Sequence, residues 1–107
     1  MSLLNDELMA RFKAIGGQEE ETNPVCIAKF FLPSHSATWY AIAYYPDERN
    51  FFGYVTGLGV DEYGYFSLDE LEELRHPLFG LPVERDEHFE EMKMSEIKAQ
   101  IAFKGLM

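Results

Sequence analysis

Residues 38–58 read TWYAIAYYPDERNFFGYVTGL, which is two runs rich in aromatic and β-branched residues joined by a short polar segment. Such runs are typical of β-strands, and a proline followed by charged residues and asparagine is typical of a turn. Residues 25–32 and 63–66 have the same strand-like composition on either side. We therefore predict an antiparallel meander of four strands through the middle of the chain, and residues 81–89 are a candidate fifth strand.

Helix signals lie on both sides of the predicted strands. From Asn5 to Ile15, apolar residues recur at helical spacing behind a capping asparagine, and two glycines follow. Ser67 and Glu70 have the spacing of a capping box, and Ser95 is a candidate cap for a last helix. The sequence thus predicts an α+β fold, in which helices at the N-terminus, after the fourth strand and at the C-terminus cover mainly one face of an antiparallel sheet.

The chain has 107 residues, of which 47% are apolar. We expect residues 1–107 to form a single domain, with a helical N-terminal extension at residues 1–24 and a C-terminal helix at residues 93–107. Cys26 is the only cysteine and lies in an apolar run, which predicts a buried thiol in a reducing compartment. No segment has the pattern of a signal peptide or the apolar length of a membrane span, so we expect a cytoplasmic protein without membrane contact.

Twelve of the 16 aromatic residues lie between Phe30 and Phe66. Because neighbouring residues of a strand point to opposite faces of a sheet, helices on one face cannot cover all of these rings. We predict that some of them form a protein-binding patch on the second face, and a second small core is the alternative. Stacking of nucleobases is disfavoured because only Lys29 and Arg49 lie in this region to contact a phosphate backbone. The candidate patch residues are Trp39, Tyr40, Tyr44 and Tyr54.

Acidic side chains outnumber basic ones by 19 to 9, which gives a formal charge of −10, and nine of the acids lie in residues 67–91. This charge disfavours direct binding of nucleic acid. One interpretation is a solvated surface that keeps the protein soluble. Another is a carboxylate array that mimics DNA and inhibits a restriction or modification enzyme. The acidic residues considered for this surface are Asp69, Glu70, Glu72, Glu73, Glu84, Asp86 and Glu87.

Residue types that carry out catalysis or bind metals show no recognisable spacing. The three histidines lie in three separate segments, so we predict no metal and no cofactor. Cys26 lies within a strand-like run and Ser67 is explained as a helix cap, so no catalytic nucleophile is predicted. Gly57 and Gly59 are interpreted as turn residues, because neither a third glycine nor a helix follows to hold a phosphate.

Five blocks follow one another in order between residues 25 and 92. The blocks are Ala28–Pro33, Thr38–Tyr40, Phe51–Gly53, Gly64–Glu72 and Gly80–Asp86. In this combination they resemble an uncharacterised bacterial family, domain of unknown function 2958, whose core would span residues 25–92. The resemblance implies a small protein encoded on plasmids, phages or integrating elements, often near conjugation or anti-restriction genes. It implies no established activity.

The Glu-Arg-Asp cluster at residues 84–86 belongs to the last block, and no cap or turn signal explains it. An internal ion pair at Arg85 is one interpretation, because a guanidinium group suits bidentate pairing with a carboxylate. A binding site for a small anion beside Arg85 is another. If the cluster lined a deep cleft with His35, Trp39 and Tyr40, the protein would be a candidate enzyme.

We therefore expect a non-enzymatic accessory protein of a mobile genetic element that acts by binding another protein, with Arg85 among the contact residues. The alternatives are an acidic DNA mimic that inhibits a restriction or modification enzyme, and an enzyme with a site around residues 84–86. The sequence leaves a homodimer open.

Overall fold

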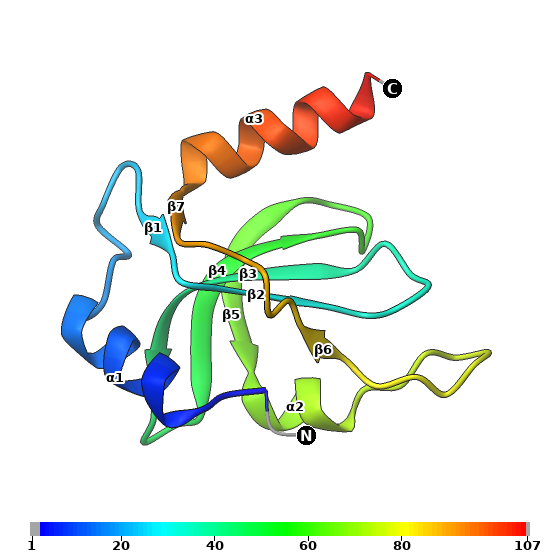
Figure 1. Ribbon diagram of the computed structural model, residues 1–107, viewed down its shortest axis with the longest axis horizontal. Helices are drawn as coiled ribbons and strands as arrows, with labels where there is room; N and C mark the ends of the chain where they lie inside the picture. Colours follow the sequence, from blue (N-terminus) through cyan, green and yellow to red (C-terminus); the bar gives the residue numbers. More distant parts are fainter. Residues whose placement is uncertain (1–2, 107) are drawn as a thin grey trace.

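The computed structural model describes residues 3–106, and its main element is a five-stranded antiparallel sheet with the strand order β5-β4-β3-β2-β6 (Figure 1). These strands are β2 (Ala28–Phe31), β3 (Thr38–Tyr45), β4 (Asn50–Thr56), β5 (Glu62–Ser67) and β6 (Glu84–Arg85). A smaller sheet pairs β1 (Val25–Cys26) with β7 (Met92–Lys93). The helices are α1 (Asp6–Ile15), α2 (Leu68–Glu73) and α3 (Met94–Gly105). The predicted α+β fold, its meander and the three helix positions are confirmed.

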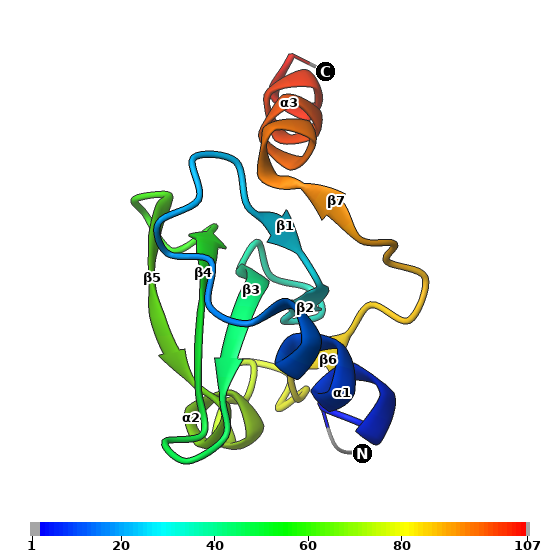
Figure 2. The same ribbon diagram turned by 90° about the vertical axis from the view of Figure 1, so that its left-hand side faces the viewer.

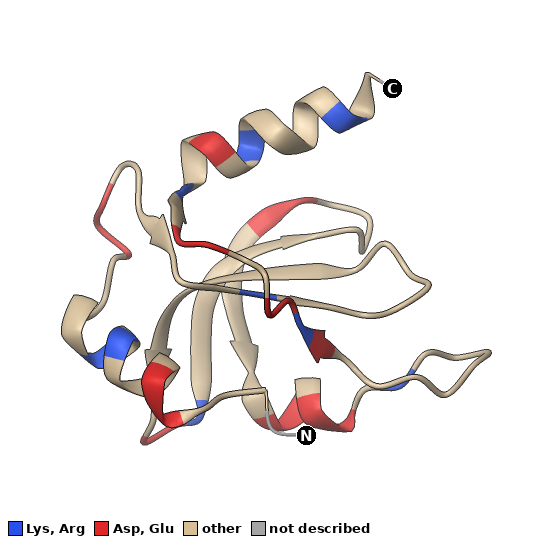
Figure 3. Ribbon diagram, viewed as in Figure 1, with Lys and Arg blue, Asp and Glu red and all other residues tan. Residues whose placement is uncertain are grey.

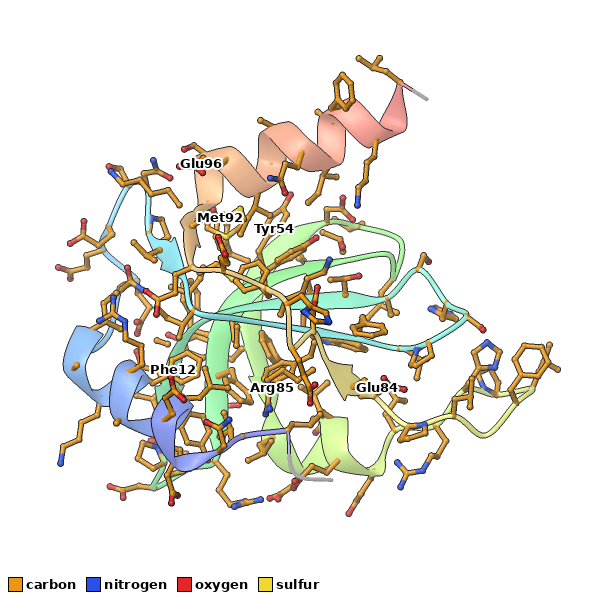
Figure 4. The ribbon with its side chains drawn as sticks, viewed as in Figure 1. Phe12, Tyr54, Glu84, Arg85, Met92 and Glu96 are labelled. Atoms are coloured by element: carbon orange, nitrogen blue, oxygen red, sulfur yellow. The ribbon has the colours of Figure 1, made fainter. Side chains whose placement is uncertain are left out.

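The main core lies on the first face of the large sheet, where α1, α2 and the segment before α1 pack. Phe12 of α1 points toward the sheet (Figure 4) and contacts the rings of Tyr44 and Phe51, with ring centroids 6.1 and 5.9 Å apart. Leu3 and Leu4 are buried in the same core. The N-terminal extension is therefore an integral part of the domain rather than an appendage, because its removal would expose the centre of the sheet.

The second face carries a smaller core beneath α3 and β7. Met94 and Ile97 of α3 pack with Cys26, Tyr40 and Ile42, all of them buried. Figure 1 shows α3 on the side of the sheet away from α1 and α2. The expectation that helices cover mainly one face is thus wrong, and the alternative of a second small core describes most of this face.

A β-bulge in β3 decides which side chains enter each core. Ala41 pairs with Gly53 and Ala43 with Phe52, so Ile42 is an extra residue on β3. A bulge reverses the alternation of the strand beyond it, which lets Trp39 and Tyr44 occupy the same core although they are an odd number of residues apart. The carbonyl of Ile42 accepts a hydrogen bond of 2.9 Å from the buried side-chain amide of Gln18.

Local capping signals hold for two helices and fail for the third. Asn5 accepts a hydrogen bond from the Leu8 amide at 2.8 Å, and Ser67 accepts one from the Glu70 amide at 3.3 Å. Ser95 does not cap α3. Its backbone amide instead donates to the side chain of Asn23 at 2.9 Å, which joins the helix to the loop before β1.

The predicted strand over residues 25–32 is two strands. The break falls at Ile27, whose amide donates to the Ala41 carbonyl at 2.8 Å. Val25 and Cys26 on one side pair with β7, whereas residues 28–31 pair with β3 and β6. A uniform apolar run cannot indicate this change of partner, because both halves are buried.

We expect Gly53→Ala to destabilise the protein severely, because a β-carbon at this position would lie 2.0 Å from the Tyr40 carbonyl oxygen. The loss in the free energy of unfolding should be at least about 2 kcal/mol, measured by urea denaturation. Gly64→Ala is the matched control, since Gly64 pairs with Gly53 on the next strand and its β-carbon would meet nothing within 4 Å. It should change stability by less than about 1 kcal/mol. Equal effects of the two variants would contradict the close approach at the bulge.

Candidate protein-binding surface

Three of the four aromatic residues predicted to bind a partner are buried. Trp39 and Tyr44 belong to the main core and Tyr40 to the second core, with exposed fractions of 5, 8 and 8%. The prediction is wrong for these residues, because the bulge and α3 bury them. Tyr54 is half-buried and points from the sheet toward α3 (Figure 4).

Among the aromatic side chains of the large sheet, the two that are exposed to solvent lie on β5. Tyr63 is 38% and Tyr65 is 60% exposed. Tyr63 pairs with Tyr54 and Tyr65 with Phe52, and the ring centroids of these pairs are 4.9 and 5.2 Å apart. We call these four residues, Phe52, Tyr54, Tyr63 and Tyr65, the tyrosine edge. It is a continuous aromatic surface on the second face, which ends at the last strand of the sheet.

At the end of the tyrosine edge that adjoins α3, the Lys98 side chain contacts two of the rings. The Lys98 ammonium group lies 5.0 Å from the ring centre of Tyr54 and 4.5 Å from that of Tyr63. A cation over an aromatic face is attracted by the negative potential of the ring. The contact therefore joins α3 to β4 and β5 and holds the two tyrosine rings in position.

The other end of the tyrosine edge is acidic. The Glu19 carboxylate accepts hydrogen bonds from the hydroxyl groups of Tyr45 and Tyr65, the latter at 3.4 Å. The bond from Tyr45 lowers the pKa of Glu19, while burial and the bond to Glu19 raise the pKa of Tyr45. A second carboxylate, that of Glu48, lies nearby. Glu19 and Glu48 line an open hollow of about 390 Å³ together with Tyr45, Asn50 and Tyr65. This hollow suits a positively charged group.

The seven acids singled out from the sequence are divided between two parts of the molecule. Asp69 and Glu72 of α2 both bind Arg49, at 2.8 and 3.1 Å, so part of the charge of α2 is neutralised. Glu70 and Glu73 are exposed on the same helix, and Glu84 and Glu87 are exposed on and after β6. In Figure 3 acidic residues also occupy α1 and the loop before β1. The acids are therefore spread over several elements of the molecule.

The residues of the Glu-Arg-Asp cluster point in different directions. The Arg85 guanidinium donates to the Leu3 carbonyl at 2.8 Å, and no carboxylate of residues 3–106 lies within ion-pair distance of it. The predicted internal ion pair at Arg85 is therefore wrong, and this side chain anchors the N-terminal segment instead. The side chain of Glu84 points away from β6 on the side opposite to the Arg85 side chain (Figure 4). The carboxylate of Asp86 lies 3.9 Å from the Lys29 ammonium group.

The surface beside the cluster is an open hollow of about 580 Å³. Its lining includes Lys29, His35, Asp86 and His88. Tyr40 lines an adjoining hollow of about 290 Å³, whereas Trp39 is buried in the core of the first face. Glu84, Arg85 and Asp86 all line the larger hollow together with His35, so of the three residues suggested for a cleft only His35 shares an open hollow with the cluster. Within residues 3–106, no three His, Cys, Asp or Glu side chains gather in an arrangement that could hold a metal ion.

None of the helices formed by residues 3–106 has both the length and the apolar character that crossing a bilayer demands. The sequence matches the model of a family described as protein of unknown function (DUF2958) over residues 3–104. The chain belongs to this family. The match extends beyond the expected core of residues 25–92 at both ends, in agreement with the packing of α1 and α3 on the sheet. Comparison with curated proteins and with solved structures gives no match.

Sequence analysis missed Tyr63 and Tyr65 as surface residues, although a local signal was present. The two tyrosines flank Gly64, so the strand presents two aromatic rings on one face and no side chain between them on the other. Gly64 leaves part of the first face of the strand open, although Phe66 on the same face is buried in the main core. Which strand forms the margin is a property of the whole topology, and the sequence does not specify it.

We expect Lys98→Met to loosen α3 without unfolding the sheet, because the variant keeps the apolar stem and loses the cation. Burial raises the pKa of the Cys26 thiol, which lies beneath Met94 and Ile97, so thiol labelling requires local opening. The rate of labelling by a disulfide reagent should rise roughly fivefold. Lys104→Met is the control, since Lys104 lies on the same helix near its end. A labelling rate unchanged from wild type would show that the contact does not hold α3.

Glu19→Gln should reduce stability at neutral pH and have a smaller effect in acid. The folded state lowers the pKa of Glu19, so its contribution is complete above the ordinary value and is lost as the pH falls through the lowered value. Melting temperatures of wild type and variant should therefore differ at pH 7 and converge below about pH 4. The exposed neighbour variant Glu20→Gln should show no such convergence. A constant difference between wild type and Glu19→Gln across this range would refute the role of the carboxylate.

Proposed function

We propose that this protein is a non-enzymatic accessory protein of a mobile genetic element and that it acts by binding another protein through the tyrosine edge. The observation that carries the proposal is the exposure of Tyr63 and Tyr65 at the margin of a sheet whose other large rings are mostly buried. Tyrosine is enriched among the residues that dominate the binding energy of protein interfaces. The association with mobile elements rests on the family resemblance.

The tyrosine edge has the rigidity that a binding surface needs. Tyr63 is held between the ring of Tyr54 and the ammonium group of Lys98, and Tyr65 packs on Phe52. Side chains that are already ordered lose little conformational entropy when a partner binds. The surface therefore offers aromatic area to a partner at a low entropic cost.

Charge favours a protein over a nucleic acid as the partner. The chain carries a formal charge of −10, and Glu19 and Glu48 lie beside Tyr65. A phosphate backbone would be repelled from this surface, whereas the basic side chains of a protein would be attracted. The same charges increase the rate of encounter with a basic partner, and this effect weakens as the salt concentration rises.

A second candidate function is catalysis in the hollow lined by Lys29, His35, Asp86 and His88. The observation that favours it is the convergence of groups that can donate and accept protons on one concave surface. Lys29→Met and His88→Ala separate the two candidates. They should abolish the biological effect of an enzyme, and they should leave binding through the tyrosine edge unchanged.

Photocrosslinking tests the proposed function. A benzophenone amino acid placed at position 65 should capture a specific protein in cells that carry the gene, and the same group at Met9, exposed on α1, should not capture it. The captured protein is then purified and its dissociation constant measured by calorimetry. The double variant Tyr63→Ser, Tyr65→Ser should weaken binding at least about tenfold. Equal capture from both positions, or an unchanged constant, would refute the proposal.

A further inference from the structure

The strand that carries the tyrosine edge has one unpaired side. β5 is the last strand in the order β5-β4-β3-β2-β6, and Figure 2 shows it at the outside of the molecule. β6 at the opposite margin is only two residues long, whereas β5 has six. The large sheet therefore has one margin long enough to accept another strand.

The hydrogen-bond register identifies the backbone groups that face outward. The Leu68 amide donates to the Arg49 carbonyl at 2.9 Å, immediately beyond the pair formed by Ser67 and Asn50. In an antiparallel ladder, residues that bond to the neighbouring strand alternate with residues whose backbone groups point away. The even-numbered residues of β5 therefore bond to β4. The amide and carbonyl groups of Tyr63 and Tyr65 point away from the sheet, and no hydrogen bond within residues 3–106 engages them.

Most of the usual devices that prevent pairing at an exposed margin are missing from β5, whose one charged side chain is Glu62 at its first residue. Natural sheets protect such strands with lysine, proline, bulges or a covering segment. The strand reads EYGYFS, and its pairing with β4 is regular over all six residues. Gly64 leaves open space on the first face. The margin is thus a continuous template for main-chain hydrogen bonds.

The acidic residues near both ends of β5 determine which kind of strand could pair with it. Asp61 and Glu62 are exposed at one end of β5, and Glu19 and Glu48 lie beside Tyr65 near the other. Two copies of the chain could pair β5 with β5, with Tyr63 of each opposite Tyr65 of the other. That register would place Asp61 of one copy next to the acidic first turn of α2 of the other, which is unfavourable. A basic segment meets no such repulsion.

We infer that β5 accepts an extended segment of the partner protein as an added strand, and that this segment carries a lysine or arginine directed toward Glu19 and Glu48. The inference rests on the proposed function and specifies its mode. Side chains that are directly or diagonally opposite on adjacent strands share a face. A long basic side chain in such a position can cross the exposed ring of Tyr65 to reach the acidic hollow, and both contacts favour a cation.

Synthetic peptides of defined sequence test this mode without knowledge of the partner. The probe is a capped heptapeptide of alternating threonine and valine with lysine at its centre. In ¹⁵N-resolved NMR spectra it should shift the amide signals of Tyr63 and Tyr65 more than those of even-numbered β5 residues. A peptide with glutamate at the centre should bind at least about tenfold more weakly at low salt. A lysine peptide with N-methylated amides along one edge should bind weakly, because the added ladder cannot form.

Three protein variants separate the backbone contribution from the charge contribution. Tyr65→Pro removes an outward-facing amide and no ladder bond to β4, and it should abolish peptide binding, while Tyr65→Ala keeps the amide and should retain weak binding. The double variant Glu19→Gln, Glu48→Gln should bind the lysine and glutamate peptides with nearly equal affinity. Far-ultraviolet circular dichroism checks the fold of each variant, and the N-methylated peptide provides the same test on the wild-type protein.

The outcomes distinguish this inference from the proposed function. Equal binding of the methylated and unmethylated peptides, or amide shifts remote from β5, would refute strand addition. The photocrosslinked partner gives a second test. If it fails to bind the double variant Tyr63→Ser, Tyr65→Ser but binds Tyr65→Pro and Tyr65→Ala equally well, the tyrosine edge binds the partner without an added strand. Dimerisation of the protein alone, abolished by Tyr65→Pro, would identify a second copy as the occupant and refute the basic segment.

Discussion

The close approach of β4 to β3 at Gly53 is the constraint on which the rest of the structure depends. The absence of a side chain there lets the Tyr40 carbonyl pass, so Ile42 can form the bulge. The bulge reverses the alternation of β3 and sends its rings into two cores rather than one. It also presents the Ile42 carbonyl to Gln18, whose amide binds Val25 as well. The loop held in this way places Glu19 at the acidic end of the tyrosine edge, so the position of this carboxylate depends on the bulge.

Features that depend on neighbouring residues could be predicted from the sequence, and features that depend on distant pairing could not. Asn5 and Ser67 cap their helices because the amides they bind are three residues away. Ser95 has the same chemistry, but α3 begins before it at Met94, and its hydroxyl group accepts a hydrogen bond from Asn23 of a distant loop. The position of the bulge depends on Gly53 in the next strand, so the burial of Trp39 and Tyr44 cannot be read from their own strand. The acidic surface could be predicted by counting charges, but the role of Arg85 required the position of the N-terminal segment.

The burial of the aromatic residues decreases from the centre of the sheet to β5, so that the central rings stabilise the fold and the outer ones are available for the proposed binding. Phe51 packs against Phe30, Tyr44 and Phe66 with ring centroids 5.3, 4.7 and 5.2 Å apart, and the resulting cluster is buried. Burial of large rings contributes most of the hydrophobic stabilisation of a small domain. This core and the segments around α1 supply that hydrophobic stabilisation. β5 therefore stays in place although only one of its sides is paired. The outer side of β5 is therefore free for a partner.

An exposed aromatic margin on a regular strand would ordinarily favour aggregation, and the charge of the chain explains how such a margin can persist. Each copy carries −10, and acids lie at both ends of β5, so two copies that approach margin to margin repel one another. The same field attracts a basic segment. In the proposed mode of binding, repulsion between copies and attraction of a basic partner arise from one set of carboxylates, which would give the acidity a role beyond solubility. Screening by salt must weaken both effects together, so selectivity for a basic partner and protection from self-pairing should decline in parallel as ionic strength increases.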